Sequence, residues 1–218
     1  MKEKFIFACQ QCGNQYSKWV GRCSECGAWN SVVEERKIEP KKKASVTRSS
    51  VPQPMSAISA ETVPRWVTDI PEFDEILGGG LVPGSVVLLG GEPGIGKSTL
   101  LLQAANQYAK THSGLYVTAE ESPSQVSLRA TRLGTEGKNL FLISETSLEQ
   151  IHQHVDTLKP GFLIIDSIQT IFSENLESQP GSVGQLRECA FSIIQLAKER
   201  NIPTFLVGHV TKEGAIAG

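Results

Sequence analysis

The stretch GGEPGIGKSTLL, residues 90–101, constrains the fold more than any other part of this 218-residue chain. Residues 91–98 match the pattern G-x-x-x-x-G-K-[ST], which requires an apolar strand before it and a helix after it. Such a loop directs backbone N–H groups and a helix N-terminus toward phosphate groups. We expect Lys97 to contact the β- and γ-phosphates of ATP, Ser98 to bind Mg²⁺ and Thr99 to lie near the α-phosphate. The predicted ATP-binding residues are Gly91, Glu92, Pro93, Gly94, Ile95, Gly96, Lys97, Ser98 and Thr99.

Apolar runs of strand length alternate with longer segments of helical pattern from Trp66 onward. The expected strands are residues 85–91, 114–120, 139–144, 162–168 and 202–210. The expected helices are residues 98–110, 123–134, 147–159 and 183–200. Because the strands are continuous apolar runs, helices are expected to cover both of their faces. We therefore predict an α/β fold with a mostly parallel sheet flanked by helices.

Four of the five cysteines form two copies of the pattern Cys-x-x-Cys-Gly near the start of the chain. A tetrahedral zinc site needs four ligands such as thiolates, and two tight turns supply two thiolates each. The glycines that follow the pairs, Gly13 and Gly27, suit a left-handed turn. The pattern predicts a closed, structural Zn²⁺ site, with a redox-active dithiol or disulfide pair as the alternative. The expected ligands are Cys9, Cys12, Cys23 and Cys26.

Aromatic and basic side chains accompany these cysteines in the sequence, namely Lys18, Trp19, Arg22 and Trp29. This mixture is typical of a surface that binds nucleic acid. The alternative is that the two tryptophans form the small core of the zinc module. The fifth cysteine, Cys189, lies within an expected helix and is predicted to be a small buried apolar residue.

Charge and composition divide the chain into parts. The first 50 residues hold 10 Lys/Arg and 5 Asp/Glu, whereas the remainder holds 11 and 18. A basic N-terminal part indicates either a polyanionic partner or a solvated tail. The segment after the cysteines is polar and contains prolines and a lysine run, so it cannot bury a core. We predict a four-cysteine zinc finger at residues 1–33, a flexible linker at 34–62 and an ATPase domain at 63–218.

No apolar run in the sequence is long enough to span a membrane. The N-terminus lacks the apolar core and the small-residue cleavage site of a signal peptide. We therefore expect a cytoplasmic protein without a membrane partner.

Three further positions complete the predicted nucleotide site. Asp166 ends an apolar strand, as expected of a Walker B carboxylate that serves Mg²⁺. The next residue is Ser167 rather than a glutamate, so the group that activates water is expected elsewhere. Glu120 is our candidate for it, although Glu120 or Glu121 could instead cap the following helix. His209, at the end of the last strand, is either a γ-phosphate sensor or a histidine satisfied locally at the sheet edge.

With these residues assembled, the chain resembles the RadA (Sms) family of bacterial RecA-like ATPases over nearly its whole length. The segments that carry the resemblance are CQQCGNQYSKWVGRCSECGAWNS, FDEILGGGLVPGSVVLLGGEPGIGKSTLLLQ, YVTAEES, LIIDSIQT, PGSVGQLRECA and VGHVTKEGAIAG. The resemblance implies a RecA-like core that forms homo-hexameric rings on single-stranded DNA. It further implies ATP-driven branch migration of recombination intermediates, together with RecA, in DNA repair.

The resemblance also assigns roles to residues of this chain. By analogy Glu120 activates water, Asp166 is the Walker B carboxylate and His209 occupies the sensor position. Residues 172–185 match a mobile loop that faces DNA. Members of the family continue with a KNRFG motif and a Lon-protease-like domain, which are absent from these 218 residues. Nucleotide binding is the activity expected to persist without them.

Two other functional classes fit parts of the sequence. A RecA-like module whose nucleotide state gates protein contacts would need the nucleotide site but no motor activity. The zinc finger is evidence against this class, whereas the absence of the KNRFG motif and the Lon-protease-like domain from these 218 residues is evidence for it. A small-molecule kinase on the same loop would need arginines in a lid over the phosphates, and no such arginine cluster follows Asp166.

Overall fold

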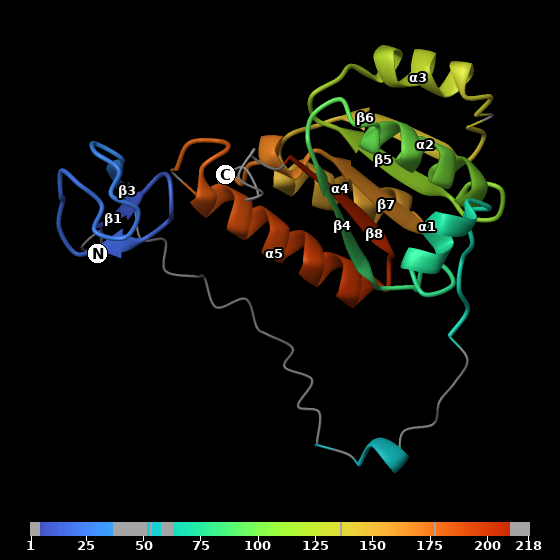
Figure 1. Ribbon diagram of the computed structural model, residues 1–218, viewed down its shortest axis with the longest axis horizontal. Helices are drawn as coiled ribbons and strands as arrows, with labels where there is room; N and C mark the ends of the chain where they lie inside the picture. The colour runs from blue at the N-terminus through green and yellow to red at the C-terminus, as the bar shows by residue number, and fades with distance from the viewer. Residues whose placement is uncertain are drawn as a thin grey trace.

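A computed structural model describes residues 5–36, 52, 54–57, 63–135, 137–176 and 178–209 of the chain (Figure 1). Most of the expected linker, residues 34–62, lies outside this described part, as does the closing segment 210–218. Within the expected linker, the structure describes the short 3₁₀ helix η1 (Met55–Ala57). None of the helices in the described part is long and apolar enough to cross a membrane.

The N-terminal module, which we call the zinc ribbon (residues 5–36), is a small antiparallel sheet. Its strands are β1 (Phe5–Cys9), β2 (Gln15–Tyr16) and β3 (Val32–Arg36), in the order β2-β1-β3. The strand β3 pairs with β1 as far as Arg36, so it runs three residues beyond the boundary expected at residue 33. The buried apolar cluster of the module is small and comprises Cys9, Cys23 and Val32.

The larger module contains a five-stranded sheet in the order β4-β8-β7-β5-β6, and every neighbouring pair in it is parallel. The strands are β4 (Val86–Gly91), β5 (Gly114–Thr118), β6 (Leu140–Ser144), β7 (Phe162–Asp166) and β8 (Thr204–His209). The helices are α1 (Pro71–Ile76), α2 (Lys97–Tyr108), α3 (Pro123–Arg132), α4 (Leu148–Leu158), η2 (Ile168–Thr170) and α5 (Val183–Arg200). The predicted α/β class with a parallel sheet and an N-terminal zinc module is confirmed.

Two apolar clusters lie on opposite faces of this sheet (Figure 1). The strand β7 shows why, because its side chains alternate between the faces. Phe162 and Ile164 join the cluster that includes α1 and α2, whereas Leu163 and Ile165 join the cluster that includes α4 and α5. All four side chains are at most 1% exposed. The continuous apolar runs of the sequence therefore reflect strands that are covered on both faces.

The pattern Ser-x-x-Gln marks the start of three helices. The hydroxyls of Ser122, Ser147 and Ser182 each accept a hydrogen bond from the backbone N–H three residues later, at 3.3–3.4 Å. These N-caps satisfy donors that have no partner within the first turn. The helices α4 and α5 end at Lys159 and Asn201, which both adopt the left-handed conformation. Local chemistry thus fixes the helix ends close to the predicted positions.

Candidate nucleotide-binding site and zinc centre

The predicted phosphate loop connects the end of β4 to the start of α2. Gly94 and Gly96 have φ values of 80° and 104°, a region that side chains rarely adopt. No side chain caps α2, so the N–H groups of its first turn remain available to an anion. Lys97 Nζ donates hydrogen bonds of 2.8 Å to the carbonyl oxygens of Gly91 and of Glu92. The lysine therefore lies across its own loop, at the position where a phosphate is expected.

A cavity lies between this loop and the carboxyl ends of β5, β7 and β8. The carboxyl edge of a parallel sheet is the usual binding edge of an α/β fold. The predicted residues that line the cavity are Pro93, Gly94, Gly96, Lys97, Ser98, Thr99, Glu120, Asp166 and His209. Gly91, Glu92 and Ile95 do not line it, and the Ile95 side chain is 71% exposed. The structure thus brings most of the predicted residues to one place.

The two neighbouring glutamates have different partners. Glu120 Oε1 accepts a hydrogen bond from the Ser167 hydroxyl and lies 3.1 Å from His209 Nε2. Glu121 forms an ion pair with Arg129, and its backbone carbonyl accepts a hydrogen bond of 2.7 Å from the Thr118 hydroxyl. Neither carboxylate caps α3, because the Ser122 hydroxyl does so. Glu121 is therefore held by the arginine of α3, whereas Glu120 contacts the ends of β7 and β8.

His209 stands between the phosphate loop and Glu120. Its Nδ1 lies 3.4 Å from Lys97 Nζ, and its Nε2 faces the Glu120 carboxylate. The strand β8 lies between β4 and β7, so His209 stands at the carboxyl end of an inner strand of the sheet. The imidazole therefore connects two predicted site residues within the centre of the sheet.

Asp166 has a partner that the sequence alone does not single out. The buried Tyr116 donates a hydrogen bond of 2.6 Å from its hydroxyl to Asp166 Oδ2. Burial, followed by the neighbouring Asp166 charge, raises the pKa of Tyr116 far above its ordinary value, so the phenol stays protonated as the donor. The two residues lie on the adjacent strands β5 and β7, where Thr118 is in register with Asp166.

The segment matched to a DNA-facing loop is anchored at both ends. Gln185 is 1% exposed, and its amide bonds the N–H and the carbonyl of Ser173 at 2.8 and 3.2 Å. It also donates to the carbonyls of Leu176 and Ser178 at 3.3 and 3.0 Å. From α4, Glu149 accepts a hydrogen bond of 2.7 Å from the Ser173 hydroxyl. Gln185 therefore belongs to a buried anchor at the base of the segment.

The four predicted zinc ligands converge in the zinc ribbon. Their Sγ atoms all lie within 4.8 Å of one another. Two of the pairs, Cys9 with Cys26 and Cys12 with Cys23, are 3.6 and 3.5 Å apart, well beyond the ~2.05 Å of a disulfide bond, and all four cysteines are free thiols. Four thiolates at such mutual distances are the ligand set of a closed structural zinc site.

The two knuckles repeat one hydrogen-bond pattern. Gly13 N–H donates to Cys9 O at 2.8 Å, and Gly27 N–H donates to Cys23 O at 3.0 Å. Both glycines are left-handed, with φ values of 72° and 73°, as predicted. Backbone N–H of Cys26 and the Tyr16 hydroxyl, 3.1 Å from the sulfur, lower the pKa of Cys23 to about 6. A sulfur held as thiolate near neutral pH is suited to bind a metal.

Two family models match the chain at the modules that the geometry separates. A model described as AAA domain matches residues 52–215, and one described as rubredoxin metal binding domain matches residues 7–34. The chain belongs to the AAA domain family. In this AAA domain protein, the four-cysteine site of the zinc ribbon falls within the second match.

The chain is also similar to proteins named DNA repair protein RadA. It is 46% identical to that of Bacillus subtilis (strain 168), over 100% of this chain and 49% of the relative. It is 47% identical to that of Listeria monocytogenes, over 97% and 47%, and 48% identical to that of Aquifex aeolicus, over 100% and 49%. The family resemblance is confirmed, and the chain spans about half the length of the curated relatives it matches.

The tryptophans of the zinc ribbon do not form its core. The Trp19 and Trp29 side chains are 58% and 71% exposed, so the alternative of a tryptophan mini-core is wrong. The Trp19 ring is fixed by a hydrogen bond of 3.1 Å from Nε1 to Val32 O. The Arg22 guanidinium lies 5.5 Å from the centre of the Trp29 ring. The AAA domain protein thus presents two aromatic rings and an arginine to solvent.

Proposed function

We propose that the chain is the zinc-ribbon and ATPase portion of a DNA-dependent ATPase of recombinational repair. In this proposal it drives branch migration of recombination intermediates together with RecA, as a homo-hexamer on single-stranded DNA. The observation that carries the proposal is the series of contacts from Lys97 through His209 to Glu120, with separations of 3.4 and 3.1 Å. Lys97 and Glu120 both line one cavity, which supports a phosphate-binding role for the lysine and a water-activating role for the carboxylate.

The site has the parts that hydrolysis of ATP requires. The Ser98 hydroxyl and the Asp166 carboxylate line one cavity and are oxygen donors, which suit Mg²⁺. A bound Mg²⁺ would offset the negative charge of the phosphates. Lys97 leaves the carbonyls of its loop to contact the β- and γ-phosphates. Glu120 accepts a proton from the attacking water, and Ser167 and His209 hold this carboxylate in place.

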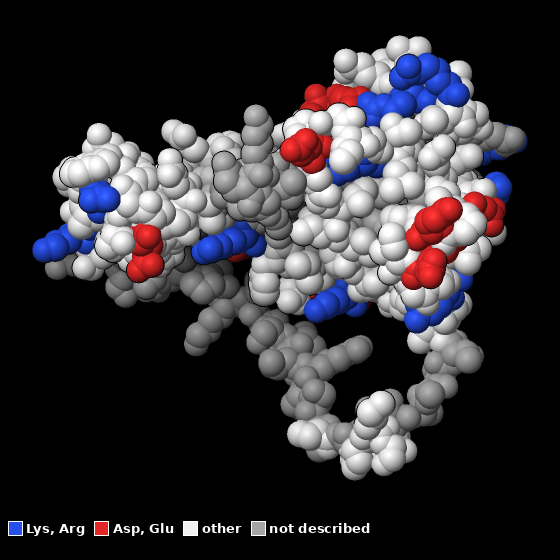
Figure 2. Space-filling model, in the orientation of Figure 1, with Lys and Arg blue, Asp and Glu red and all other residues white. Residues whose placement is uncertain are grey.

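Three observations support DNA as the partner. The exposed tryptophans of the zinc ribbon offer rings on which bases can stack, and Arg22 adds a positive charge. The first 50 residues contain twice as many Lys/Arg as Asp/Glu. The relatives at 46–48% identity are named as DNA repair proteins. Figure 2 shows basic and acidic side chains interspersed over the visible face, without one dominant basic patch.

The zinc ribbon lies beside the anchored segment. A Cβ placed on Gly13 would be 3.2 Å from Val183 Cγ1 and 3.1 Å from Arg187 Nη1. The first knuckle therefore touches the N-terminal turns of α5, which directly follow the segment at residues 172–182 (Figure 1). We infer that a single strand of DNA can contact the zinc ribbon and the segment at residues 172–182 at the same time.

Steady-state ATP turnover of the protein at the full length of its curated relatives, with and without single-stranded oligonucleotide and at two salt concentrations, tests the proposal. We expect stimulation by DNA that weakens at the higher salt concentration, because phosphate contacts release counterions. Equal turnover with and without DNA would contradict the motor function. It would favour the alternative of a nucleotide-dependent switch, in which the contacts of His209 report the bound nucleotide.

The variant Glu120→Gln tests the assignment of the water-activating group. We expect turnover to fall by roughly 10²–10⁴-fold with nucleotide affinity retained, because a positioned general base contributes about that much. Glu121→Gln is the matched control on the adjacent residue, and its loss is expected to be much smaller. Equal losses in the two variants would contradict the assignment.

Lys97→Ala is expected to abolish ATP binding, and unchanged affinity would contradict the phosphate site.

A further inference from the structure

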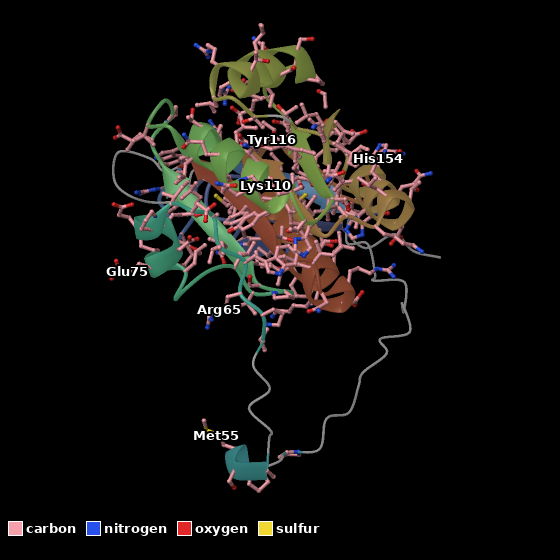
Figure 3. All side chains as sticks on the ribbon, turned by 90° about the vertical axis from the view of Figure 1, so that its right-hand side faces the viewer. Met55, Arg65, Glu75, Lys110, Tyr116 and His154 are labelled. Atoms are coloured by element: carbon pink, nitrogen blue, oxygen red, sulfur yellow. The ribbon has the colours of Figure 1, made fainter. Side chains whose placement is uncertain are left out.

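The side chain of Tyr116 is buried and can influence the nucleotide site only through its hydroxyl group. The side chain is 0% exposed and belongs to the apolar cluster that includes α1 and α2. Figure 3 shows Tyr116 among the strands and helices of the sheet-and-helix body, whereas Glu75 lies at its outer side and Met55 lies on η1, away from the body. Tyr116 does not line the cavity, whereas Asp166 does. Any influence of this phenol on the site therefore passes through Asp166.

The backbone around Tyr116 leaves its hydroxyl little freedom. The strand β5 is flanked by β7 and β6, with Tyr116 opposite Ile164 on one side and Leu142 on the other. A side chain that is buried on a central strand has few accessible rotamers. The hydrogen bond of 2.6 Å therefore holds Asp166 Oδ2 at one position. Asp166 Oδ1 has no hydrogen-bond partner within the described part of the chain and remains available to a ligand.

We propose that Tyr116 is a positioning residue for the metal site, which fixes the Asp166 carboxylate so that its second oxygen serves Mg²⁺. The inference rests on the proposed function, because it assumes that Asp166 and Ser98 hold the metal of a bound nucleotide. Hydrogen bonds from outer groups orient ligating carboxylates and commonly change metal affinity by ~10–100-fold. Without the phenol the carboxylate can rotate and must be ordered when the metal binds.

Direct metal binding by the 218-residue chain tests this inference without turnover. Mn²⁺ serves as the probe, and free Mn²⁺ is counted by electron paramagnetic resonance in the presence of a non-hydrolysable ATP analogue. We expect Tyr116→Phe to weaken Mn²⁺ binding by about 10-fold, because the substitution removes one hydroxyl that orients Asp166.

Tyr108→Phe is the matched control. Tyr108 is also a buried tyrosine of the same cluster, and its hydroxyl has no hydrogen-bond partner among the residues that the structure describes. We expect this variant to bind Mn²⁺ like the wild type. Unchanged Mn²⁺ affinity in Tyr116→Phe, or an equal loss in Tyr108→Phe, would overturn the role of Tyr116. A wild-type chain that binds the analogue but not Mn²⁺ would overturn the proposed metal site as well.

Discussion

The zinc ribbon and the AAA domain are held together by different means. The buried core of the ribbon comprises Cys9, Cys23 and Val32, and two of these three are metal ligands. The AAA domain has an apolar cluster on each face of its sheet, with large buried side chains such as Phe205 and Ile193. The stability of the zinc ribbon thus depends on one four-cysteine site, whereas the stability of the AAA domain is distributed over many contacts.

This difference follows from size. A module of about 30 residues buries too little apolar surface to offset the conformational entropy of its chain. The four cysteines take the place of a larger apolar core. The side chains of Trp19 and Trp29 are therefore not needed in the interior and remain exposed. In the AAA domain, the sheet and helices support polar groups that form contacts far from one another in sequence. A metal suffices to order a small surface, but a packed core is needed to position a nucleotide site.

The largest expected effect is that of zinc removal on the ribbon. Binding of structural zinc contributes about 10–16 kcal/mol in zinc-finger peptides, so chelation is expected to unfold the ribbon completely. The AAA domain should keep its unfolding temperature, because all four cysteine ligands lie in the ribbon. Zinc analysis, thiol titration and amide NMR signals of β1 and β3 would measure both parts.

Two variants accompany that experiment. Cys12→Ser removes one ligand and is expected to reproduce the chelated state. Cys189→Ala removes the remaining cysteine, which is buried in α5, and is expected to leave the zinc content unchanged. A ribbon that stays folded in reduced, metal-free protein would show that its core is sufficient after all.

The next effect concerns the core of the AAA domain. Phe205 is 0% exposed, and its ring stacks with those of Phe73 and Tyr108 at centroid distances of 6.0 and 6.4 Å. Phe205→Ala is expected to lower the free energy of unfolding of this domain by about 3–5 kcal/mol, because it leaves a cavity. Phe191→Ala, at a 60% exposed position of α5, is the control and should cost less than ~0.5 kcal/mol. Denaturant unfolding at constant zinc content would test the pair, and loss of zinc from Phe205→Ala would show that the modules are coupled.

The sequence predicts those parts of the two modules that depend on neighbours along the chain. The phosphate loop and the cysteine knuckles are local patterns. These features were predictable because one turn of backbone determines each of them. The alternating apolar runs predicted the parallel sheet for the same reason.

The remaining contacts depend on strand order, which no local pattern encodes. Tyr116 and Asp166 are 50 positions apart, and Glu120 and His209 are 89 positions apart. They meet because β5 pairs with β7 and because β8 lies inside the sheet. A sequence reveals which residues are capable of chemistry, whereas the register decides which of them meet.

A smaller effect is expected where the AAA domain uses one polar side chain as an anchor. Gln185→Ala removes the side-chain amide and its four hydrogen bonds. The backbone groups that lose this partner are the N–H and carbonyl of Ser173 and the carbonyls of Leu176 and Ser178. We expect a loss of about 1–3 kcal/mol, because these backbone groups are left unsatisfied. Gln150→Ala is the control, since Gln150 holds the same third position of α4 but is exposed. Hydrogen exchange of residues 172–182 would locate the effect, and equal protection in both variants would contradict the anchor.

The smallest effect is that of a single helix cap. The Ser122 hydroxyl accepts a hydrogen bond from Gln125 N–H, and the Gln125 side chain accepts one of 2.9 Å from Ser122 N–H. Ser122→Ala is expected to cost about 1 kcal/mol, the usual value for an N-cap. Ser124→Ala, at an exposed position of the same helix, is the control and should be neutral or slightly stabilising. Thermal unfolding gives the free energies, and ATP turnover shows whether the Glu120–Glu121 turn before the cap is disturbed. If Ser122→Ala unfolded the AAA domain as completely as chelation unfolds the ribbon, stability would not be distributed in this domain.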